Sequence, residues 1–379
     1  MAFTGIFPRP GEPVPTGLLT LVLCHECGLL QLAHNFDLKL LYGPTYGYRS
    51  GLNASMVAHL KTKANQLSHR VYPVKSDVIL DIGSNDGTLL ANYPVECQRL
   101  GVDPNADKWR HYYPTGIEAI NDFFPSHEVE AWLNGRKPKI ITTVAMFYDL
   151  PDPLDFTEKI ARMLHEDGIW HLEQLYLPAM LATNGFDSIC HEHLEYYSLS
   201  NINHLCNLTG LKIIDVTFNT INGGSFAVTV AHKDSYHNVS PVVTTKLREE
   251  RSLGLTDTGT YRRFKVGIDR MMAQLDEVLD SFKGMVLGYG ASTKGNVLLQ
   301  YNSISLPAIA EVNPDKFGCV TPGTNIPIIS ESEAKAMKPE AFLVLPWHFY
   351  ESIVKRESEY LRGGGQLILP LPNPKVICE

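Results

Sequence analysis

Residues 78–90 constrain the fold of this chain more than any other segment, with the sequence Val-Ile-Leu-Asp-Ile-Gly-Ser-Asn-Asp-Gly-Thr-Leu-Leu. The pattern predicts a short apolar strand, a turn that contains Gly83 and Gly87, and a helix after the turn. Glycine has no Cβ, so a ligand can approach the backbone of this turn closely. A second apolar stretch ends in Asp103, where alternating β/α topology places a carboxylate against a ribose diol. Together the two segments predict the ligand-binding edge of an open α/β sheet.

The glycine turn is not of the type that binds dinucleotides. From Gly83 onward it lacks the third glycine that brings helix and strand together around a pyrophosphate. Counted from Asp81, the spacing acid, x, Gly, x, x, x, Gly resembles the S-adenosylmethionine-binding loop of class I methyltransferases. This resemblance implies that the glycines admit the methionine portion of the cofactor and that Asp103 holds its ribose. The residues predicted to contact the cofactor are Asp81, Gly83, Asn85, Gly87, Asp103, Asn121, Asp122 and Ala145.

Later segments continue the alternation of strands and helices. Apolar β-type runs occur at residues 139–147, 168–174, 212–216 and 226–231, and a helical pattern occupies residues 152–164. Such alternation predicts a doubly wound sheet. The length of 379 residues allows two or three domains.

Composition and charge exclude several classes of protein. Hydrophobic residues at 44% and charged residues at 20% are typical of a soluble globular protein, and no apolar run approaches the roughly 18 residues of a membrane span. Residues 1–10 lack the charged start and apolar stretch of a signal peptide, so we expect a cytoplasmic protein without a membrane partner. The formal net charge of -8 argues against a nucleic-acid partner.

Residues 188–198 hold an unusual density of titratable groups: a thiol, two imidazoles, two carboxylates and two phenols. Burying such groups together is costly unless they are paired, so the density indicates a functional site. The segment follows the fifth predicted strand and should overhang the ligand-binding edge of the sheet. Residues 42–56 are rich in tyrosine and glycine, and we interpret them as a lid or pocket wall.

The last part of the chain repeats the α/β logic. Residues 244–283 are charged and helical and are expected to connect two domains. Residues 284–296 again form strand, glycine-rich turn and helix start, and backbone amides with Lys294 at a helix start suit a phosphate. Two further strands end at residues 311–316 and 343–348, on the same edge. The C-terminal part of the chain is therefore predicted to bind a nucleotide diphosphate.

The seven cysteines are scattered, so a disulfide framework is not expected. Cys24 and Cys27 have the spacing of half a zinc knuckle. No second such pair occurs, and a zinc site would need His25, His34 or a more distant ligand. Buried, reduced thiols are the alternative that we favour, and zinc stays a doubtful cofactor.

Five motifs in this order resemble the nucleotide-sugar C-methyltransferases over nearly the whole chain: residues 81–87, 190–193, 222–225, 288–291 and 313–316. The resemblance implies transfer of a methyl group from S-adenosylmethionine to C-3 of a nucleotide-linked 4-keto-6-deoxyhexose. It also implies a zinc-binding N-terminal part, a methyltransferase domain and a C-terminal α/β domain.

We accordingly predict four parts: an N-terminal segment with a single CxxC and a tyrosine-rich lid (1–60), the methyltransferase domain (61–240), a helical connector (241–283) and a nucleotide-sugar-binding α/β domain (284–379). A monomer or small homo-oligomer is expected.

Besides its single CxxC, the chain departs from the family pattern at two positions near the predicted active site. Cys190 stands where relatives have a tyrosine, and Tyr148 stands where they have a histidine. The position of the catalytic base, which the resemblance places on His193, is kept.

Carbon methylation requires a carbanion equivalent, which a neighbouring ketone provides as an enolate. An imidazole is a suitable base near neutral pH, Glu192 could orient it or bind a sugar hydroxyl, and a donor to the enolate oxygen is also needed. The candidate catalytic residues are His193, Glu192, His191, Tyr48, Tyr46 and Cys190. The candidate substrate-binding residues are Asn222, Gly223, Tyr289, Ser292, Lys294, Asn313, Lys316, Trp347 and His348.

Four alternatives stay open. His193 could be a structural histidine bonded to a backbone carbonyl, or it could bind a metal together with Cys190 and His191, although that spacing is awkward for one tetrahedral ion. The acceptor could be a keto sugar carried by GDP or UDP. The chain could also be a binding module without activity.

Overall fold

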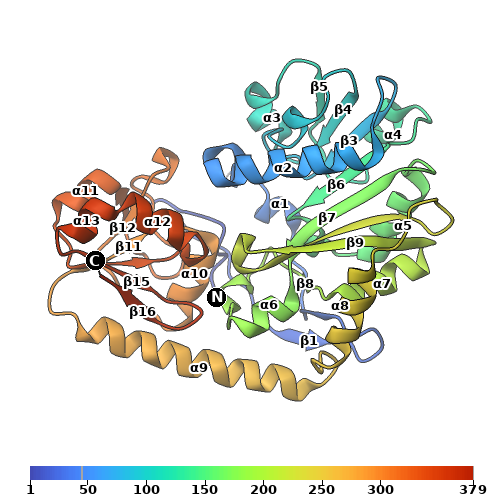
Figure 1. Cartoon of the computed structure of the whole chain (residues 1–379). Helices are drawn as coiled ribbons and strands as arrows, with labels where there is room; N and C mark the ends of the chain where they lie inside the picture. Colours follow the sequence, from blue (N-terminus) through green and yellow to red (C-terminus); the bar gives the residue numbers. More distant parts are fainter. Residues whose placement is uncertain (44–45, 379) are drawn as a thin grey trace.

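In the computed structural model, which describes residues 1–43 and 46–378, a seven-stranded sheet forms the centre of the larger α/β unit (Figure 1). Its strand order is β5-β4-β3-β6-β7-β10-β9. The first five of these strands are parallel, and β10 runs antiparallel to both of its neighbours. The strands are β3 (Val78–Ile82), β4 (Gln98–Val102), β5 (Ile117–Ile120), β6 (Ile140–Val144), β7 (Ile169–Leu175), β9 (Leu211–Asn219) and β10 (Ser225–His232).

Burial explains the sequence of the central strands. Every residue of β3 and of β7 is buried, as expected for parallel strands that helices cover on both faces. The covering helices are α2 (Ala54–Val71), α3 (Ala106–Trp109), α4 (His127–Leu133), α5 (Pro153–Met163), α6 (Leu177–Ala182), α7 (Leu199–Leu208) and α8 (Pro241–Arg251). The predicted doubly wound fold is thus confirmed for this unit.

The prediction of a helix directly after the glycine turn is wrong. Only a short 3-10 helix (Leu90–Asn92) follows the turn, because Pro94 and the start of β4 leave too little chain. The apolar face of α2, which precedes β3, fills the place instead: Leu60 and Leu67 lie in the same buried cluster as Ile79 and Leu90.

The N-terminal segment joins the dense stretch of titratable residues in a small sheet. Its strands β1 (Leu21–Leu23) and β2 (Leu30–Leu32) pair with β8 (Glu195–Tyr196) in the order β1-β2-β8. The short helix α1 (Leu38–Leu41) follows and leads to the tyrosine-rich loop. The segment 1–42 therefore packs against the predicted catalytic stretch, which sequence order alone did not indicate.

A long helix, α9 (Thr258–Ser281), leads from α8 to the second unit and lies along one side of the molecule (Figure 1). Its buried residues Phe264, Ile268, Met271 and Leu275 recur at helical spacing. The charged segment predicted as a connector is thus two helices, α8 and α9, because Gly254 interrupts it with a left-handed turn (φ +64°).

The second α/β unit contains a six-stranded sheet with the order β13-β12-β11-β14-β15-β16 in the described chain. All pairs are parallel except the last. Its elements are β11 (Val286–Tyr289), α10 (Thr293–Tyr301), β12 (Ile309–Glu311), β13 (Ile328–Ser330), α11 (Glu331–Ala336), β14 (Ala341–Val344), α12 (Tyr350–Arg356), α13 (Ser358–Arg362), β15 (Gln366–Leu369) and β16 (Lys375–Ile377). The predicted C-terminal α/β domain is confirmed.

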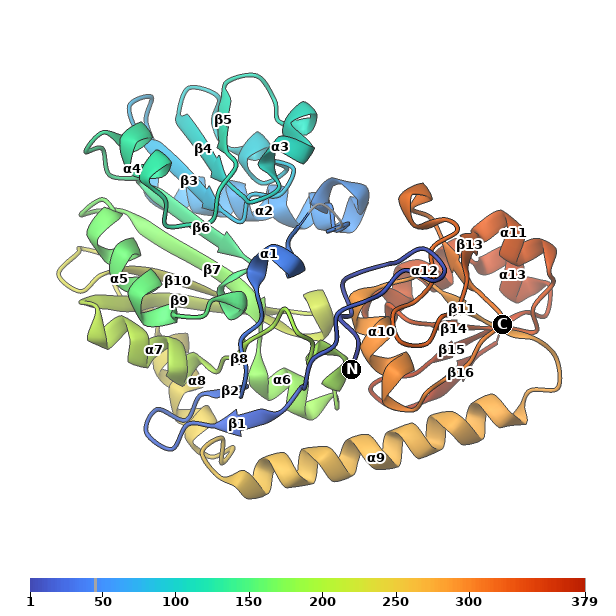
Figure 2. The ribbon, with the colours of Figure 1, turned by 180° about the vertical axis from the view of Figure 1, so that it is seen from behind.

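The first residues of the chain run between the two units, beside α10 (Figure 2). We call residues 2–9 the N-terminal arm. Backbone and side-chain hydrogen bonds join it to the second unit: Gln300 bonds to both backbone groups of Ala2, and the amide of Val320 donates to the carbonyl of Pro8. Within the described chain, no helix is long and apolar enough to cross a membrane.

Candidate active site

A cavity of about 440 Å³ lies where the two units meet. The carboxyl ends of β3, β4, β6 and β7 form its floor, the tyrosine-rich loop and the 188–193 segment form its walls, and the start of α10 closes one side. Open α/β sheets bind ligands at this edge. Twelve of the predicted site residues line it: Tyr46, Tyr48, Asp81, Gly83, Asn85, Asp103, Asp122, Ala145, Glu192, His193, Asn222 and Lys294.

The glycine turn after β3 forms one end of the cavity. Gly83 has a φ of +75°, and a Cβ there would lie 3.0 Å from Met146. Gly87 has a φ of +74° and packs against Tyr113, outside the cavity lining. Left-handed backbone also occurs at Asn85 (φ +50°) within the turn. Both glycines are therefore needed for the turn itself, and Gly83 also keeps the backbone accessible to a ligand.

Two carboxylates hold this end of the cavity together. Asp103 accepts hydrogen bonds from the amides of Asn85 (2.9 Å) and Asn105 (2.7 Å), which joins the ends of β3 and β4. Asp81 accepts from the Thr142 hydroxyl at 2.6 Å, and burial raises the pKa of Asp81 to about 7. Both acids line the cavity.

The other predicted cofactor residues divide between the cavity and its surroundings. Ala145 lines the cavity in a left-handed conformation (φ +54°) at the end of β6. Asp122 lines it after β5, whereas the side chain of Asn121 accepts from the amide of Asp107 and lies outside the lining.

The tyrosine-rich loop is fastened to the glycine turn. The amides of Ser50 and Gly51 donate to the side chains of Asn85 and Asp86, each at 2.9 Å. The Asn85 amide group donates in return to the carbonyl of Tyr48 (3.0 Å). Because these bonds hold residues 48–51 over the cofactor end, Tyr46 and Tyr48 become part of the cavity wall.

His193 lies in the cavity wall with a defined tautomer. Its Nδ1 is 2.8 Å from the carbonyl oxygen of Ser188, and a carbonyl can only accept, so Nδ1 carries the proton. The Nε2 lone pair is then available. Burial and, as a smaller cause, the positive charge of Lys294 lower the pKa of His193 to about 4, so the imidazole is neutral at physiological pH. The ring of Tyr148 packs on it with centroids 4.2 Å apart.

Glu192 lies beside His193 and also lines the cavity. Burial raises its pKa, while hydrogen bonds from Cys190, the Gly5 amide and Thr4 act in the opposite direction. The Thr4 hydroxyl is 3.5 Å from Oε2. Cys190 is itself fully buried and absent from the lining, and burial raises its pKa, so its thiol acts on the cavity only through Glu192.

His191 points away from the cavity. Its ring packs between Phe3 and Phe36, with centroid distances of 4.5 and 4.9 Å, and its Nε2 is 3.3 Å from the carbonyl oxygen of Gly17. It does not line the cavity. The structure thus separates His191 from His193, because the chain bends at residues 190–192, where the His193 amide donates to the carbonyl of Cys190. Among the described residues these two histidines and Cys190 do not form a group that could hold a metal ion.

Several cavity residues were missed from the sequence. Asp149, directly after Tyr148, accepts from the Tyr42 hydroxyl at 2.5 Å, and burial raises its pKa. Gln174 presents an amide group whose atoms are buried without a partner in the described chain. Glu173 pairs with Lys63 (2.9 Å). Their positions after β6 and at the end of β7 could have indicated them from the sequence, because side chains at these strand ends meet at the ligand-binding edge of the sheet.

The second unit contributes Lys294 directly to the cavity. Its Nζ donates to the carbonyl oxygen of Asn222 at 2.6 Å. Trp347 lies against Gly223 and donates from Nε1 to Asp187 at 2.7 Å, so it joins the two units instead of lining the cavity.

The remaining predicted substrate residues lie outside the cavity lining. His348 is close enough to Lys294 for that charge to lower its pKa, although burial is the larger cause. Tyr289 is buried in the second unit and bonds to Glu357 at 2.7 Å.

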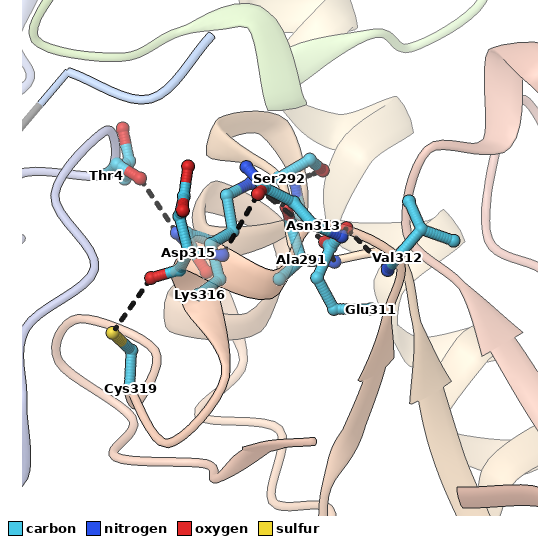
Figure 3. A network of polar contacts seen from close by, with 11 residues as sticks. Thr4, Ala291, Ser292, Glu311, Val312, Asn313, Asp315, Lys316 and Cys319 are labelled. Carbon is cyan, nitrogen blue, oxygen red and sulfur yellow. Dashed lines mark hydrogen bonds and ion pairs between the residues drawn. The ribbon is translucent and has the colours of Figure 1, made fainter. Parts of the chain in front are cut away.

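Figure 3 shows the glycine turn of the second unit, where Ser292, Asn313 and Lys316 lie together. Ser292 caps α10 by accepting from the Gly295 amide, and Asn313 accepts from the Asp315 amide. Lys316 donates to the carbonyl of Ala291 at 2.7 Å. These side chains thus bond to their own domain and not to the cavity.

Cys24 and Cys27 lie on one turn after β1 and interact with each other. The described residues include no group of three or more histidine, cysteine or acidic side chains arranged to hold a metal ion. The donors present therefore do not fit a structural zinc, since two thiolates supply only half of a tetrahedral site.

Two family models match the chain. A methyltransferase domain matches residues 56–216, and a C-methyltransferase C-terminal domain matches residues 220–372. The C-methyltransferase NovU of Streptomyces niveus is 32% identical over 368 residues, which cover 95% of this chain and 87% of that protein. This chain belongs to the C-methyltransferases. The C-methyltransferase uses S-adenosylmethionine as its methyl donor, as the first sequence motif predicted.

Solved structures also match this C-methyltransferase over about half of its length. The CcbJ methyltransferase from Streptomyces caelestis covers 46% of this chain and 89% of its own, at 12% identity and a TM-score of 0.35. The plantazolicin methyltransferase BpumL in complex with SAH covers 46% and 84%, at 13% identity and a TM-score of 0.37.

Proposed function

We propose that this C-methyltransferase methylates a carbon next to the 4-keto group of a nucleotide-linked deoxysugar, through an enolate. The observation that carries the proposal is the orientation of His193. With Nδ1–H bonded to Ser188, its neutral Nε2 can accept a proton inside the cavity that also holds the cofactor-binding edge.

The cofactor end supports this arrangement. Asp103, Asp81 and the open backbone at Gly83 provide the acids and the space that S-adenosylmethionine requires. When bound, this cofactor supplies an electrophilic methyl group. Residues 48–51 of the tyrosine-rich loop are held at that end, because the amides of Ser50 and Gly51 donate to Asn85 and Asp86.

The acceptor is proposed to lie between His193 and the wall of Tyr46 and Tyr48. His193 removes a proton from the carbon beside the ketone, and Glu192 positions a sugar hydroxyl. The family resemblance favours C-3, and C-5 is the other carbon that the same 4-keto group acidifies. Both phenols, and Asn222, can donate to sugar oxygens.

The nucleotide diphosphate is proposed to extend toward the second unit, along Ser292, Asn313 and Lys316. Basic side chains near the glycine turn suit a diphosphate. Lys316 would have to exchange its bond with Ala291 for one to phosphate.

The test is to incubate the protein with S-adenosylmethionine and a panel of 4-keto-6-deoxy sugars carried by dTDP, UDP or GDP. Mass spectrometry should show the gain of one methyl group with one of them, and NMR of the product should place it at C-3 or C-5. His193→Ala should abolish product while SAH binding, measured by calorimetry, is retained. The matched control is His204→Ala, because His204 is an exposed histidine on α7.

Two results would contradict the proposal. Undiminished turnover by His193→Ala would exclude His193 as the base. Binding of SAH and nucleotide sugar without any methyl gain across the panel would favour a binding module.

A further inference from the structure

Lys294 has an unusual position for a lysine at a helix start. It lies in the first turn of α10, in the second unit, yet its half-buried side chain reaches the first unit and lines the cavity. Its Nζ is held by the carbonyl oxygen of Asn222 at 2.6 Å. Asn222 also lines the cavity, so this bond fixes the ammonium group at the cavity wall.

Burial lowers the pKa of Lys294, and the negative charge of Asp187 acts in the opposite direction. Oδ2 of Asp187 accepts from Trp347, and its Oδ1 is buried without a hydrogen-bond partner in the described chain. The attraction to Asp187 raises the pKa of Lys294. An ammonium group with one backbone acceptor keeps two further protons to donate.

Among the described residues that line the cavity, Lys294 is the one lysine or arginine. The acidic residues of the lining are far more numerous: Asp81, Asp103, Asp122, Asp149, Asp152, Asp155, Glu173 and Glu192. Negative charge that develops on a substrate in such surroundings is opposed by the nearby carboxylates. A cation near the base would therefore favour the enolate.

Lys294 is close to the proposed base. Its positive charge acts on both His193 and His348, and it lines the same cavity as Ser188, whose carbonyl oxygen holds the His193 ring. In contrast, Lys316 of the same domain donates to Ala291 and lies over the ring of Phe7, outside the cavity. The two lysines, which the sequence predicts alike as substrate-binding residues, thus have different surroundings.

We infer that Lys294 is a catalytic residue that binds the keto oxygen of the acceptor and stabilises the enolate. This inference rests on the proposed function and changes the role of Lys294 from diphosphate binding to the reacting centre. His193 takes the proton from the carbon beside the ketone, and the electron pair of the broken C–H bond forms a C=C bond. The carbonyl π pair moves to oxygen, where the charge faces Nζ of Lys294. The C=C pair then forms a bond to the donor methyl carbon while the bond from that carbon to the sulfonium sulfur breaks. The pair of the broken bond stays on sulfur, so that SAH is the leaving group, and the carbonyl re-forms as the charge leaves the oxygen.

The experiment separates enolate formation from methyl transfer. In D₂O with SAH in place of the methyl donor, the wild-type protein should exchange the proton beside the ketone for deuterium, as followed by NMR. Lys294→Met should slow this exchange and kcat about 100-fold or more, as expected when a preorganised oxyanion donor is lost. The KM for the nucleotide sugar and the Kd for SAH should change less than about threefold.

Two matched variants control the experiment. Lys355→Met removes an exposed lysine of α12 in the same domain and should leave exchange unchanged. Lys294→Ala should regain part of its exchange rate when ethylamine is added, because the small ammonium can occupy the vacated space. If Lys294→Met does not fold, as judged by circular dichroism, Lys294→Gln replaces it, because glutamine can still donate to Asn222.

The outcomes distinguish this inference from the proposed function. If the wild-type protein neither exchanges nor methylates any keto sugar of the panel, the proposed function fails. If it does both, and the Lys294 variants exchange at the wild-type rate, the enolate role is excluded. A KM that rises more than about tenfold with unchanged exchange would instead assign Lys294 to the diphosphate.

Discussion

The two α/β units of this C-methyltransferase share a local motif, but the glycine turn borders the cavity only in the first unit. Each has a strand, a glycine turn and an acid at the end of the next strand: Asp103 after β4 and Glu311 at the end of β12. In the first unit the turn forms the floor of a cavity. In the second, Glu311 accepts from the amides of Ala291, Val312 and Asn313 (2.8, 2.8 and 2.9 Å), and the turn is closed by its own domain (Figure 3).

The difference lies in what covers each turn. The tyrosine-rich loop arches over the first turn and leaves space beneath it. At the second, Lys316 bonds to Ala291, and the N-terminal arm packs alongside, with the Asn296 amide group donating to the carbonyl of Thr4 at 2.7 Å. A glycine turn with a following acid thus indicates a possible ligand site, and the neighbouring segments decide whether a ligand has room.

The largest effect is expected at the open turn. Asp103→Ala removes the proposed ribose acceptor and leaves the amides of Asn85 and Asn105 without a partner. We expect SAH affinity to fall about 100-fold, since two hydrogen bonds to a charged group are lost. Calorimetric titration with SAH measures this. An affinity within threefold of the wild-type value would contradict the assigned role of Asp103.

The matched change at the closed turn should lower the stability of the second unit and leave the binding of SAH unchanged. Glu311→Ala leaves three backbone amides of the second unit unpaired. We expect the free energy of unfolding of this unit to fall by about 2–3 kcal/mol, with SAH affinity unchanged. Urea denaturation measures the free energy of unfolding, and calorimetric titration measures the SAH affinity. Weaker binding of SAH by a fully stable variant would contradict this separation of the two turns.

The N-terminal arm links the two regions, and Gly5 tests that link. A Cβ at Gly5 would lie 2.3 Å from Oε1 of Glu192, so Gly5→Ala must displace the carboxylate. We expect kcat to fall about tenfold while SAH affinity is retained, because a misplaced group near the reacting centre slows the reaction. Pro10→Ala, an exposed change just beyond the arm, is the control. Equal activity of both variants would show that the position of Glu192 is not critical.

The smallest effect concerns pH at the open turn. Burial raises the pKa of Asp81 to about 7, so the carboxylate is charged above this pH and takes up a proton below it. Its negative charge favours the ammonium group of the cofactor, and SAH affinity should therefore fall by up to roughly tenfold between pH 8 and pH 6. Titration calorimetry across this range measures the slope. Asp81→Asn should flatten it, and a wild-type profile that is already flat would refute the assignment.

Much of the fold followed from short-range patterns. The apolar runs at 78–82, 140–144 and 169–174 are strands because a parallel sheet covered on both faces needs nearly continuous apolar sequence. The helix expected after Gly87 failed because α2, from earlier in the chain, already covers that face of the sheet.

The candidate site could be predicted less completely from the sequence. The residues at strand ends, such as Asp81 and Asp103, line one cavity because the topology brings strand ends together, and the segment before β8 adds His193 to it. His191 and Trp347 do not line it, because the N-terminal arm and the contact between units occupy them instead. Asp149 was overlooked because nothing local distinguishes it from a capping acid.

The sequence by itself determined the class of enzyme, the methyl donor and the edge of the sheet at which chemistry takes place, since strands, glycine turns and terminal acids are encoded over a few residues. Only the tertiary structure decided which glycine turn stays open, which face His191 presents and where Lys294 points. These depend on packing between segments far apart in the chain, such as Thr4 with Asn296 and Lys294 with Asn222, and no local pattern records such contacts.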